Sequence, residues 1–103
     1  MKVPTSFKLF GNTIKVIHTP SLSFYKNAIG EARFLTEKVM LQTSNNGFPI
    51  SEKKMEQVFC HELVHHLLRS MGREKLNDDE VFVDLFGCLL HQALDTAKYV
   101  KNS

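Results

Sequence analysis

The chain has 103 residues, of which 43% are hydrophobic and 23% charged, and its 13 basic and 11 acidic side chains give a formal net charge of +2. This length holds one domain, residues 1–103, because a second hydrophobic core would need roughly 50 residues of its own, and the composition is that of a folded chain. The balanced charge argues against nucleic acid or an anionic membrane as a partner, and no apolar run approaches the roughly 18 residues of a membrane span.

The N-terminus and the cysteines favour a cytoplasmic protein. Lys8, Asn12 and Lys15 interrupt each apolar stretch near the N-terminus, so we expect no secretory signal. Cys60 and Cys88 are too few for a disulfide framework. Both lie within an apolar helical pattern, where buried thiols are expected, and reduced thiols are typical of the cytoplasm.

β-Branched and aromatic residues in the first half of the chain predict strands. Residues 7–10 and 13–18 are such segments, and the Gly-Asn dipeptide between them is a turn signal, so we expect a hairpin. Residues 31–35 and 38–43 are expected to form a second hairpin around residues 36–37.

The predicted secondary structure changes from strands to helices near Pro49. Before it, residues 24–29 are expected to form a short helical turn, and residues 44–47, with the sequence SNNG, are expected to form a loop. After it, apolar residues recur at helical spacing, which predicts two helices.

Capping residues predict where these two helices begin and end. Ser51 is expected to cap the first helix, and Gly72 is a typical C-terminal stop. The second helix is expected to open at Asn77, with Glu80 three residues later as in a capping box. We expect it to fray near residues 98–103.

The first predicted helix contains a motif with metal-binding spacing, HELVH. Its two histidines, His61 and His65, lie four residues apart and therefore share one helix face. Two neutral imidazoles held in this way are good zinc ligands. Glu62 lies on the flank of that face, where it can take a proton from a metal-bound water without ligating the metal. A pair of partly exposed histidines on an ordinary helix is the alternative interpretation.

Zinc takes a third protein ligand in such sites, and the sequence offers four candidates. They are Glu80, Asp84, His91 and His18. The first helix runs about 10 Å beyond His65, and the second returns about 4.5 Å to Glu80, so a short connection between antiparallel helices favours Glu80. The helix N-terminus also stabilises its charge. Closing the capping box is the other role open to this carboxylate.

Asp84 follows Glu80 by one helical turn and lies on the same face. It is a second candidate ligand, but a carboxylate there is better suited to accept the outer N–H of a zinc-bound histidine, which fixes the histidine tautomer. We expect His61 to be that histidine. A solvated helix carboxylate is the alternative interpretation of Asp84.

The two motifs together resemble those of the gluzincin zinc peptidases, the thermolysin-like clan. The resemblance is carried by HELVH at residues 61–65 and by EVFVDLFG at residues 80–87. The layout resembles that of the minimal gluzincins, in which a small sheet, an active-site helix and a glutamate helix make up the whole protein. Short chains of this type are also common in phages and prophages.

The resemblance implies a role for each matched residue. His61, His65 and Glu80 would hold one zinc ion. Glu62 would be the general base, and Asp84 would support a zinc-bound histidine. The implied fold is α+β, with a small antiparallel or mixed β-sheet from the N-terminal half packed on the active-site helix and on an antiparallel glutamate helix.

The chain departs from the larger gluzincins in two ways. The segment between its two motifs is short, and we expect no second domain to supply the His or Tyr that stabilises the oxyanion in those enzymes. His91, Tyr25, Tyr99 and His66 are the candidates within this chain for that role.

These patterns predict a zinc metalloendopeptidase that acts on a peptide or protein substrate. An extended substrate is expected to pair with a sheet edge formed by residues 31–35 or 38–43. The alternative is a chain that binds zinc but is latent or acts as a non-catalytic interaction module, with residues 96–103 covering the cleft or with zinc serving stability. A metal-free α+β domain is the third interpretation. The sequence does not specify the oligomeric state.

Overall fold

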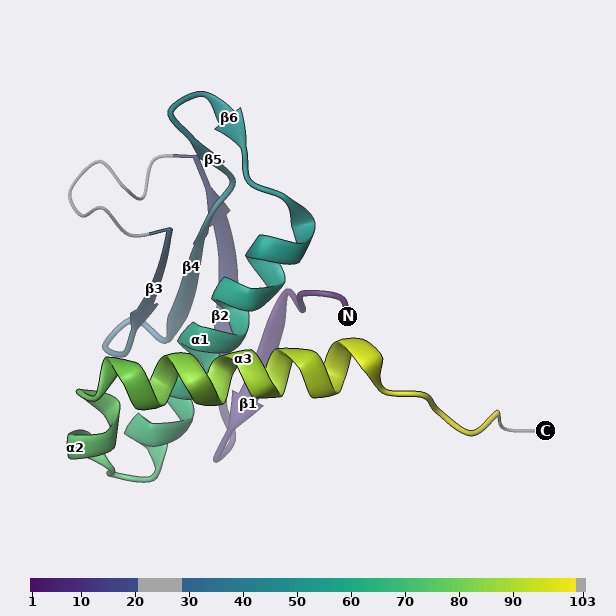
Figure 1. Cartoon of the computed structure of the whole chain (residues 1–103). Helices are drawn as coiled ribbons and strands as arrows, with labels where there is room; N and C mark the ends of the chain where they lie inside the picture. Colours follow the sequence, from purple (N-terminus) through teal and green to yellow (C-terminus); the bar gives the residue numbers. More distant parts are fainter. Residues whose placement is uncertain (21–28, 102–103) are drawn as a thin grey trace.

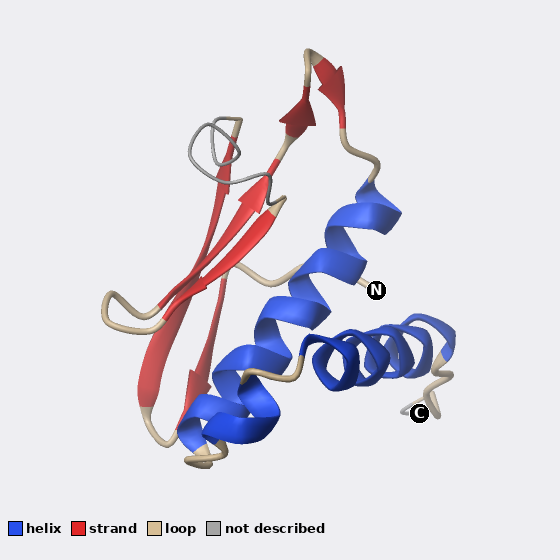
Figure 2. Ribbon diagram, turned by 60° about the vertical axis from the view of Figure 1, so that its left-hand side comes forward, coloured by secondary structure: helices blue, strands red, loops and turns tan. Residues whose placement is uncertain are grey.

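The computed structural model describes residues 1–20 and 29–101. Its elements, in chain order, are β1 (Ser6–Leu9), β2 (Asn12–Thr19), β3 (Gly30–Arg33), β4 (Lys38–Gln42), β5 (Ser44–Asn45), β6 (Phe48–Pro49), α1 (Glu52–Ser70), α2 (Glu74–Asn77) and α3 (Glu80–Thr96). The four longer strands form one sheet, α1 lies against a face of this sheet, and α3 packs on the side of α1 away from the sheet (Figures 1 and 2). The predicted α+β fold is confirmed.

The four-stranded sheet is mixed, with strand order β1-β2-β4-β3. β2 and β4 are parallel, while both hairpins, β1–β2 and β3–β4, are antiparallel as predicted. The turn of the first hairpin is one residue earlier than expected, because Phe10 and Gly11 occupy it with φ of 50° and 80°. Two consecutive positive φ values are typical of the turn that suits the twist of two-residue hairpins.

β4 lies inside the sheet, between β2 and β3. The expectation that residues 38–43 offer an edge for substrate is therefore wrong, and β3 is the edge strand on that side. The expected loop at residues 44–47 is instead the tip of a small ribbon, in which β5 pairs with β6. The helical turn expected at residues 24–29 falls almost wholly on residues 21–28, which lie outside the described residues.

The predicted boundaries of α1 are confirmed. The Ser51 side chain accepts a hydrogen bond from the backbone N–H of Lys54, at 3.2 Å, and Gly72 follows the helix with φ of 69°. One face of α1 packs on the sheet in a core formed by Ile14, Val16, Val39, Leu41, Phe59 and Cys60. This packing fixes the rotation of α1 and so decides which of its side chains point away from the sheet.

The connection between α1 and α3 differs from the prediction. Asn77 does not cap α3 but is the last residue of α2, a single helical turn that the sequence pattern did not predict. Asp79 is the cap, because its side chain accepts a hydrogen bond from the backbone N–H of Phe82 at 3.0 Å. A capping box between Asn77 and Glu80 is therefore absent, which leaves the Glu80 carboxylate available to the face of α1.

α1 and α3 pack antiparallel, as expected. The residue pairs in contact run in opposite chain order, from His65 and Glu80 at one end to Lys53 and Asp95 at the other, and the two axes cross obliquely (Figure 2). Gly87 of α3 lies directly against the backbone of His61. Gly87 is buried, whereas Cys88 beside it is exposed, so the expected burial of both cysteines is correct only for Cys60.

The chain after α3 has no regular structure as far as residue 101 and leads away from the helices (Figure 1). The fraying expected near residue 98 thus begins at Ala97, directly after the helix. The idea that this tail covers the cleft is not supported, because its described part runs away from it. Within residues 1–20 and 29–101, no helix has the length and apolar character that crossing a membrane requires.

Candidate metal centre

Three side chains from α1 and α3 meet beside the first turn of α3. His61 Nε2 lies 3.2 Å from Glu80 Oε2, and His65 Nε2 lies 3.1 Å from Glu80 Oε1. One ligand atom from each residue lies within 4.8 Å of the other two. The structure therefore brings together the three residues that the sequence predicts as metal ligands.

The separations between these atoms fit a tetrahedral zinc site. Zinc bonds of about 2.0–2.1 Å, at the tetrahedral angle, place two ligand atoms about 3.3 Å apart. The separations of 3.1 and 3.2 Å between the imidazole nitrogens of His61 and His65 and the Glu80 carboxylate are close to this value. Two imidazoles and one carboxylate are the donor set of a catalytic zinc site, in which the fourth position stays open.

An oxygen-bearing side chain lies next to the Nδ1 atom of each imidazole. His65 Nδ1 lies 2.5 Å from Asn77 Oδ1, and His61 Nδ1 lies 3.5 Å from Asp84 Oδ1. Because an amide oxygen only accepts hydrogen bonds, His65 carries its proton on Nδ1 and keeps the lone pair of Nε2 for a metal. Asp84 thus lies beside the predicted partner. The contact of Asn77 with His65 was not predicted from the sequence, because an asparagine just before an acidic helix start is typical of a capping residue.

Glu62 is buried beside the centre, with 6% of its surface exposed. Burial raises the pKa of its carboxyl to about 8, and the nearby negative charges of Glu80 and Glu31 add to the rise, while a hydrogen bond with the backbone of Ala32 opposes it. A cation held by the adjacent histidines would also oppose this rise. The carboxyl therefore holds a proton more readily than an exposed glutamate does.

The edge strand β3 approaches Glu62 closely through Gly30. A Cβ atom at Gly30 would lie 2.3 Å from Val58 Cγ1 and 3.0 Å from Glu62 Oε2, so only glycine fits at this point without movement. The backbone of Ala32, farther along the strand, is the one hydrogen-bonded to Glu62. The outer edge of β3 thus runs past Glu62.

Of the other candidate ligands and oxyanion residues, those within the described residues lie away from the centre. His91 Nε2 lies 2.9 Å from Glu56 Oε1, and His66 Nε2 lies 2.8 Å from the carbonyl oxygen of Lys38, both in buried positions. Tyr99 is 80% exposed on the tail. His18 lines a separate pocket around Met1. Tyr25 lies outside the described residues.

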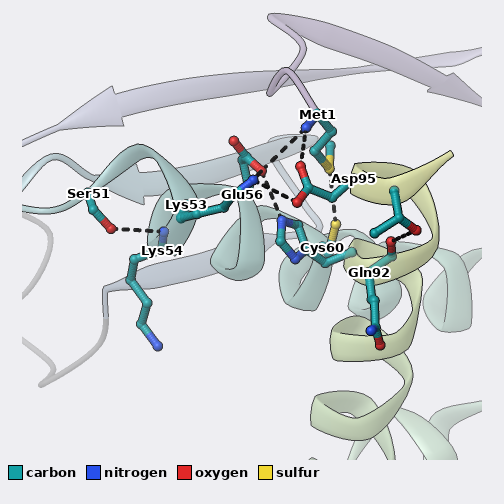
Figure 3. Close-up of polar contacts among 10 residues, drawn as sticks. Met1, Ser51, Lys53, Lys54, Glu56, Cys60, Gln92 and Asp95 are labelled. Carbon is teal, nitrogen blue, oxygen red and sulfur yellow. Dashed lines mark hydrogen bonds and ion pairs between the residues drawn. The ribbon is translucent and has the colours of Figure 1, made fainter. Parts of the chain in front are cut away.

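A second group of potential ligands lies at the other end of the helix pair, formed by Glu56, His91 and Asp95. Figure 3 shows that ammonium groups already face it. The amino group of Met1 lies 2.6 Å from Asp95 Oδ1 and 3.5 Å from Glu56, and Lys53 Nζ lies 2.6 Å from Asp95 Oδ2. Two cations offset the carboxylates, so this group is an ion-pair network that ties the N-terminus to both helices.

A cavity of about 310 Å³ opens beside the centre, between the start of β3, α1 and α3. It is lined by Ile29, Gly30, Lys54, Gln57, Val58, His61, Glu62, Asp84 and Cys88. A second, shallower groove is formed by His61 with Glu80, Val81, Asp84 and Leu85. Both hollows are open, and His61 lines each of them.

No protein-family model, no curated protein and no solved structure matches this chain.

Proposed function

We propose that this chain is a zinc-dependent metalloendopeptidase, with His61, His65 and Glu80 as the metal ligands. The observation that carries the proposal is the meeting of two imidazole Nε2 atoms with one carboxylate at 3.1–3.2 Å. The hydrogen bond of His65 Nδ1 to Asn77 supports it, because it directs the Nε2 lone pair of His65 towards Glu80, and Asp84 lies 3.5 Å from His61 Nδ1.

In the proposed mechanism the zinc ion acts as the Lewis acid and Glu62 as the general base. When bound, zinc would polarise the scissile carbonyl and lower the pKa of the attacking water towards about 7. Glu62 accepts the proton of this water and later gives it to the leaving amine. Its position supports both steps, because the carboxyl is buried next to His61 in the same cavity.

The edge of β3 is the expected binding site for the substrate backbone. An extended peptide can add to this edge as a further strand, through hydrogen bonds of its main chain. Because Ala32 of β3 is hydrogen-bonded to Glu62, a peptide on this edge passes directly by the general base. This placement supports cleavage within an extended segment.

Metal analysis and two variants test the proposal. Protein purified without a polyhistidine tag is expected to contain one zinc ion per chain. His61→Ala removes a ligand and should lose the metal, whereas Glu62→Gln should keep the metal and lose hydrolysis of a mixed peptide library. His18→Ala is the matched control, because His18 lies in a separate pocket, and it should change neither.

Two results would contradict the proposal. Zinc retained at full occupancy by His61→Ala would place the metal elsewhere. Peptide hydrolysis retained by Glu62→Gln would remove the general base from the mechanism. Loss of hydrolysis on treatment with a chelator, and its return with zinc, completes the expected pattern.

A zinc-binding interaction module remains the alternative, and one observation favours it. Val81, Leu85 and Leu89 recur every fourth residue on the outer face of α3 and are 72%, 62% and 66% exposed. An apolar helix face of this kind is typical of a protein-binding surface. Zinc binding without any chelator-sensitive peptide cleavage would favour this function over the peptidase.

A further inference from the structure

The cavity beside Glu62 is the part of the molecule best placed to select substrate side chains. It shares His61 and Glu62 with the candidate centre and holds about 310 Å³. A side chain next to the scissile bond would therefore enter it, if the chain cleaves peptides as proposed above. Its walls are mixed, with apolar groups such as Val58 beside polar ones such as Gln57.

The cavity follows one face of α1 from the centre towards the start of the helix. Lys54, Val58 and His61 recur at spacings of four and three residues, so they lie on one face. Lys54 precedes His61 by seven residues, which is about 10 Å along the helix axis. The cavity thus has a metal end at His61 and a cationic end at Lys54.

Lys54 brings a positive charge that no described partner neutralises. Its neighbour Lys53 is held by Asp95 at 2.6 Å, whereas no ion pair within residues 1–20 and 29–101 involves the Lys54 side chain. Figure 3 shows the Lys54 side chain directed away from that network. Among the described lining residues, Lys54 is the one Lys or Arg.

The fixed negative group of the cavity lies at its other end. Asp84 lines it beside His61 and faces the imidazole at 3.5 Å. The end of the cavity away from Asp84 is therefore the one where Lys54 attracts a substrate carboxylate. A glutamate side chain carries its charge one methylene farther from the substrate backbone than aspartate does, and so places it nearer to Lys54.

We propose that this cavity binds a glutamate side chain of the substrate, and that Lys54 is the residue that determines this specificity. The attraction is that of a partly exposed ion pair, which favours Glu over the isosteric Gln by about fivefold. Aspartate and lysine are disfavoured, the first by reach and the second by charge.

Peptides that differ at a single position test the proposal. Peptides with Glu, Gln, Asp or Lys beside the scissile bond are compared in two assays. Hydrolysis by the zinc-loaded protein is measured with internally quenched peptides. Binding to zinc-loaded Glu62→Gln is measured by fluorescence anisotropy with singly labelled peptides. The Glu peptide should show about fivefold higher kcat/KM and tighter binding than the Gln peptide. Lys54→Met should abolish this difference, and Lys54→Glu should reverse it in favour of the Lys peptide.

Lys8→Glu makes the same charge change on an exposed position of β1 and should leave the preference unchanged. Hydrolysis with equal kcat/KM for Glu and Gln peptides would overturn the assignment of Lys54 while leaving the peptidase intact. Tighter binding of the Glu peptide, lost in Lys54→Glu but without hydrolysis by the unaltered protein, would support the pocket and refute the peptidase. No hydrolysis and no preference in binding would overturn both.

Discussion

A Cβ atom at Gly87 would lie 3.0 Å from the Cα of His61 and 3.2 Å from its backbone nitrogen. The two helices therefore touch backbone to backbone at the residue that begins the HELVH motif. This close contact sets the distance from α1 to α3, and with it the reach of the Glu80 and Asp84 side chains, which project from the same helix.

Gly87→Ala is expected to weaken zinc binding and to destabilise the fold. The added methyl group meets main chain, which cannot rotate aside, so α3 must move away from α1. Overpacking of this kind costs about 1–3 kcal/mol, against a gain of up to about 1 kcal/mol from the helix propensity of alanine.

Thermal unfolding measures the effect of Gly87→Ala on stability, and chelator competition measures its effect on zinc affinity. Gln92→Ala, on an exposed position of the same helix, is the control. A higher Tm with unchanged zinc affinity would contradict the prediction.

Asn77→Ala is expected to lower the affinity for zinc by about tenfold or more, because partners that orient a metal-bound histidine have effects of this size. Asn77 Oδ1 is the acceptor of His65 Nδ1–H, and without it the ring loses its fixed tautomer and orientation. Asn77→Asp keeps the acceptor and should retain the affinity. Competition with a zinc-binding dye measures both variants. Equal affinity in Asn77→Ala and the unaltered protein would show that Asn77 does not orient the ligand.

Local patterns account for what the sequence predicted correctly. The spacing of His61 and His65 and the cap at Ser51 depend only on neighbours within one helix, and both hairpins depend on a turn of a few residues. The meeting with Glu80 was predictable because only a short connection separates the two helices, so few arrangements were open to them.

What the sequence did not reveal depends on contacts between distant segments. The parallel pairing of β2 with β4, which makes β3 the edge, joins strands that are not consecutive in the chain. Gly30 begins β3, and the need for glycine there comes from Val58, a residue of another element. The sequence predicted Asn77 as the cap of α3, whereas Asp79 is the cap. Asn77, Asp78 and Asp79 are all suitable capping residues, and which of them caps the helix depends on the path of α2.

The ion-pair network at the far end of the helices predicts a loss of stability in acid. The ammonium groups of Lys53 and Met1 lower the pKa of Asp95 from 3.8 to about 2. A carboxyl with a lowered pKa in the folded state contributes stability that is fully present above its unfolded pKa, near pH 4, and is lost as the pH falls towards 2. Urea unfolding between pH 7 and pH 2, on metal-free protein, measures this loss.

Asp95→Asn should unfold at lower urea concentration at pH 7 and should show a smaller dependence on pH between 4 and 2. Asp78→Asn is the control, because Asp78 is the exposed C-cap residue of α2 and takes no part in the network. An identical pH dependence in Asp95→Asn and the unaltered protein would mean that the network does not stabilise the fold.

Gly30→Ala is expected to impair the general base while leaving the metal ligands in place. The new methyl group would lie 2.3 Å from Val58 Cγ1 and 3.0 Å from Glu62 Oε2, so β3 or the Glu62 side chain must shift. We expect a loss of about 1–3 kcal/mol in the free energy of unfolding, near-normal zinc content and a large fall in kcat.

The double variant Gly30→Ala/Val58→Ala tests the cause, because removing the Val58 methyl groups makes room for the new one. Alone, Val58→Ala should be destabilising, but the double variant should be less unstable than the sum of the two changes, with part of kcat restored. Strictly additive losses in unfolding free energy would mean that the contact between β3 and α1 at this point is not the constraint, and that another property of Gly30 explains the loss.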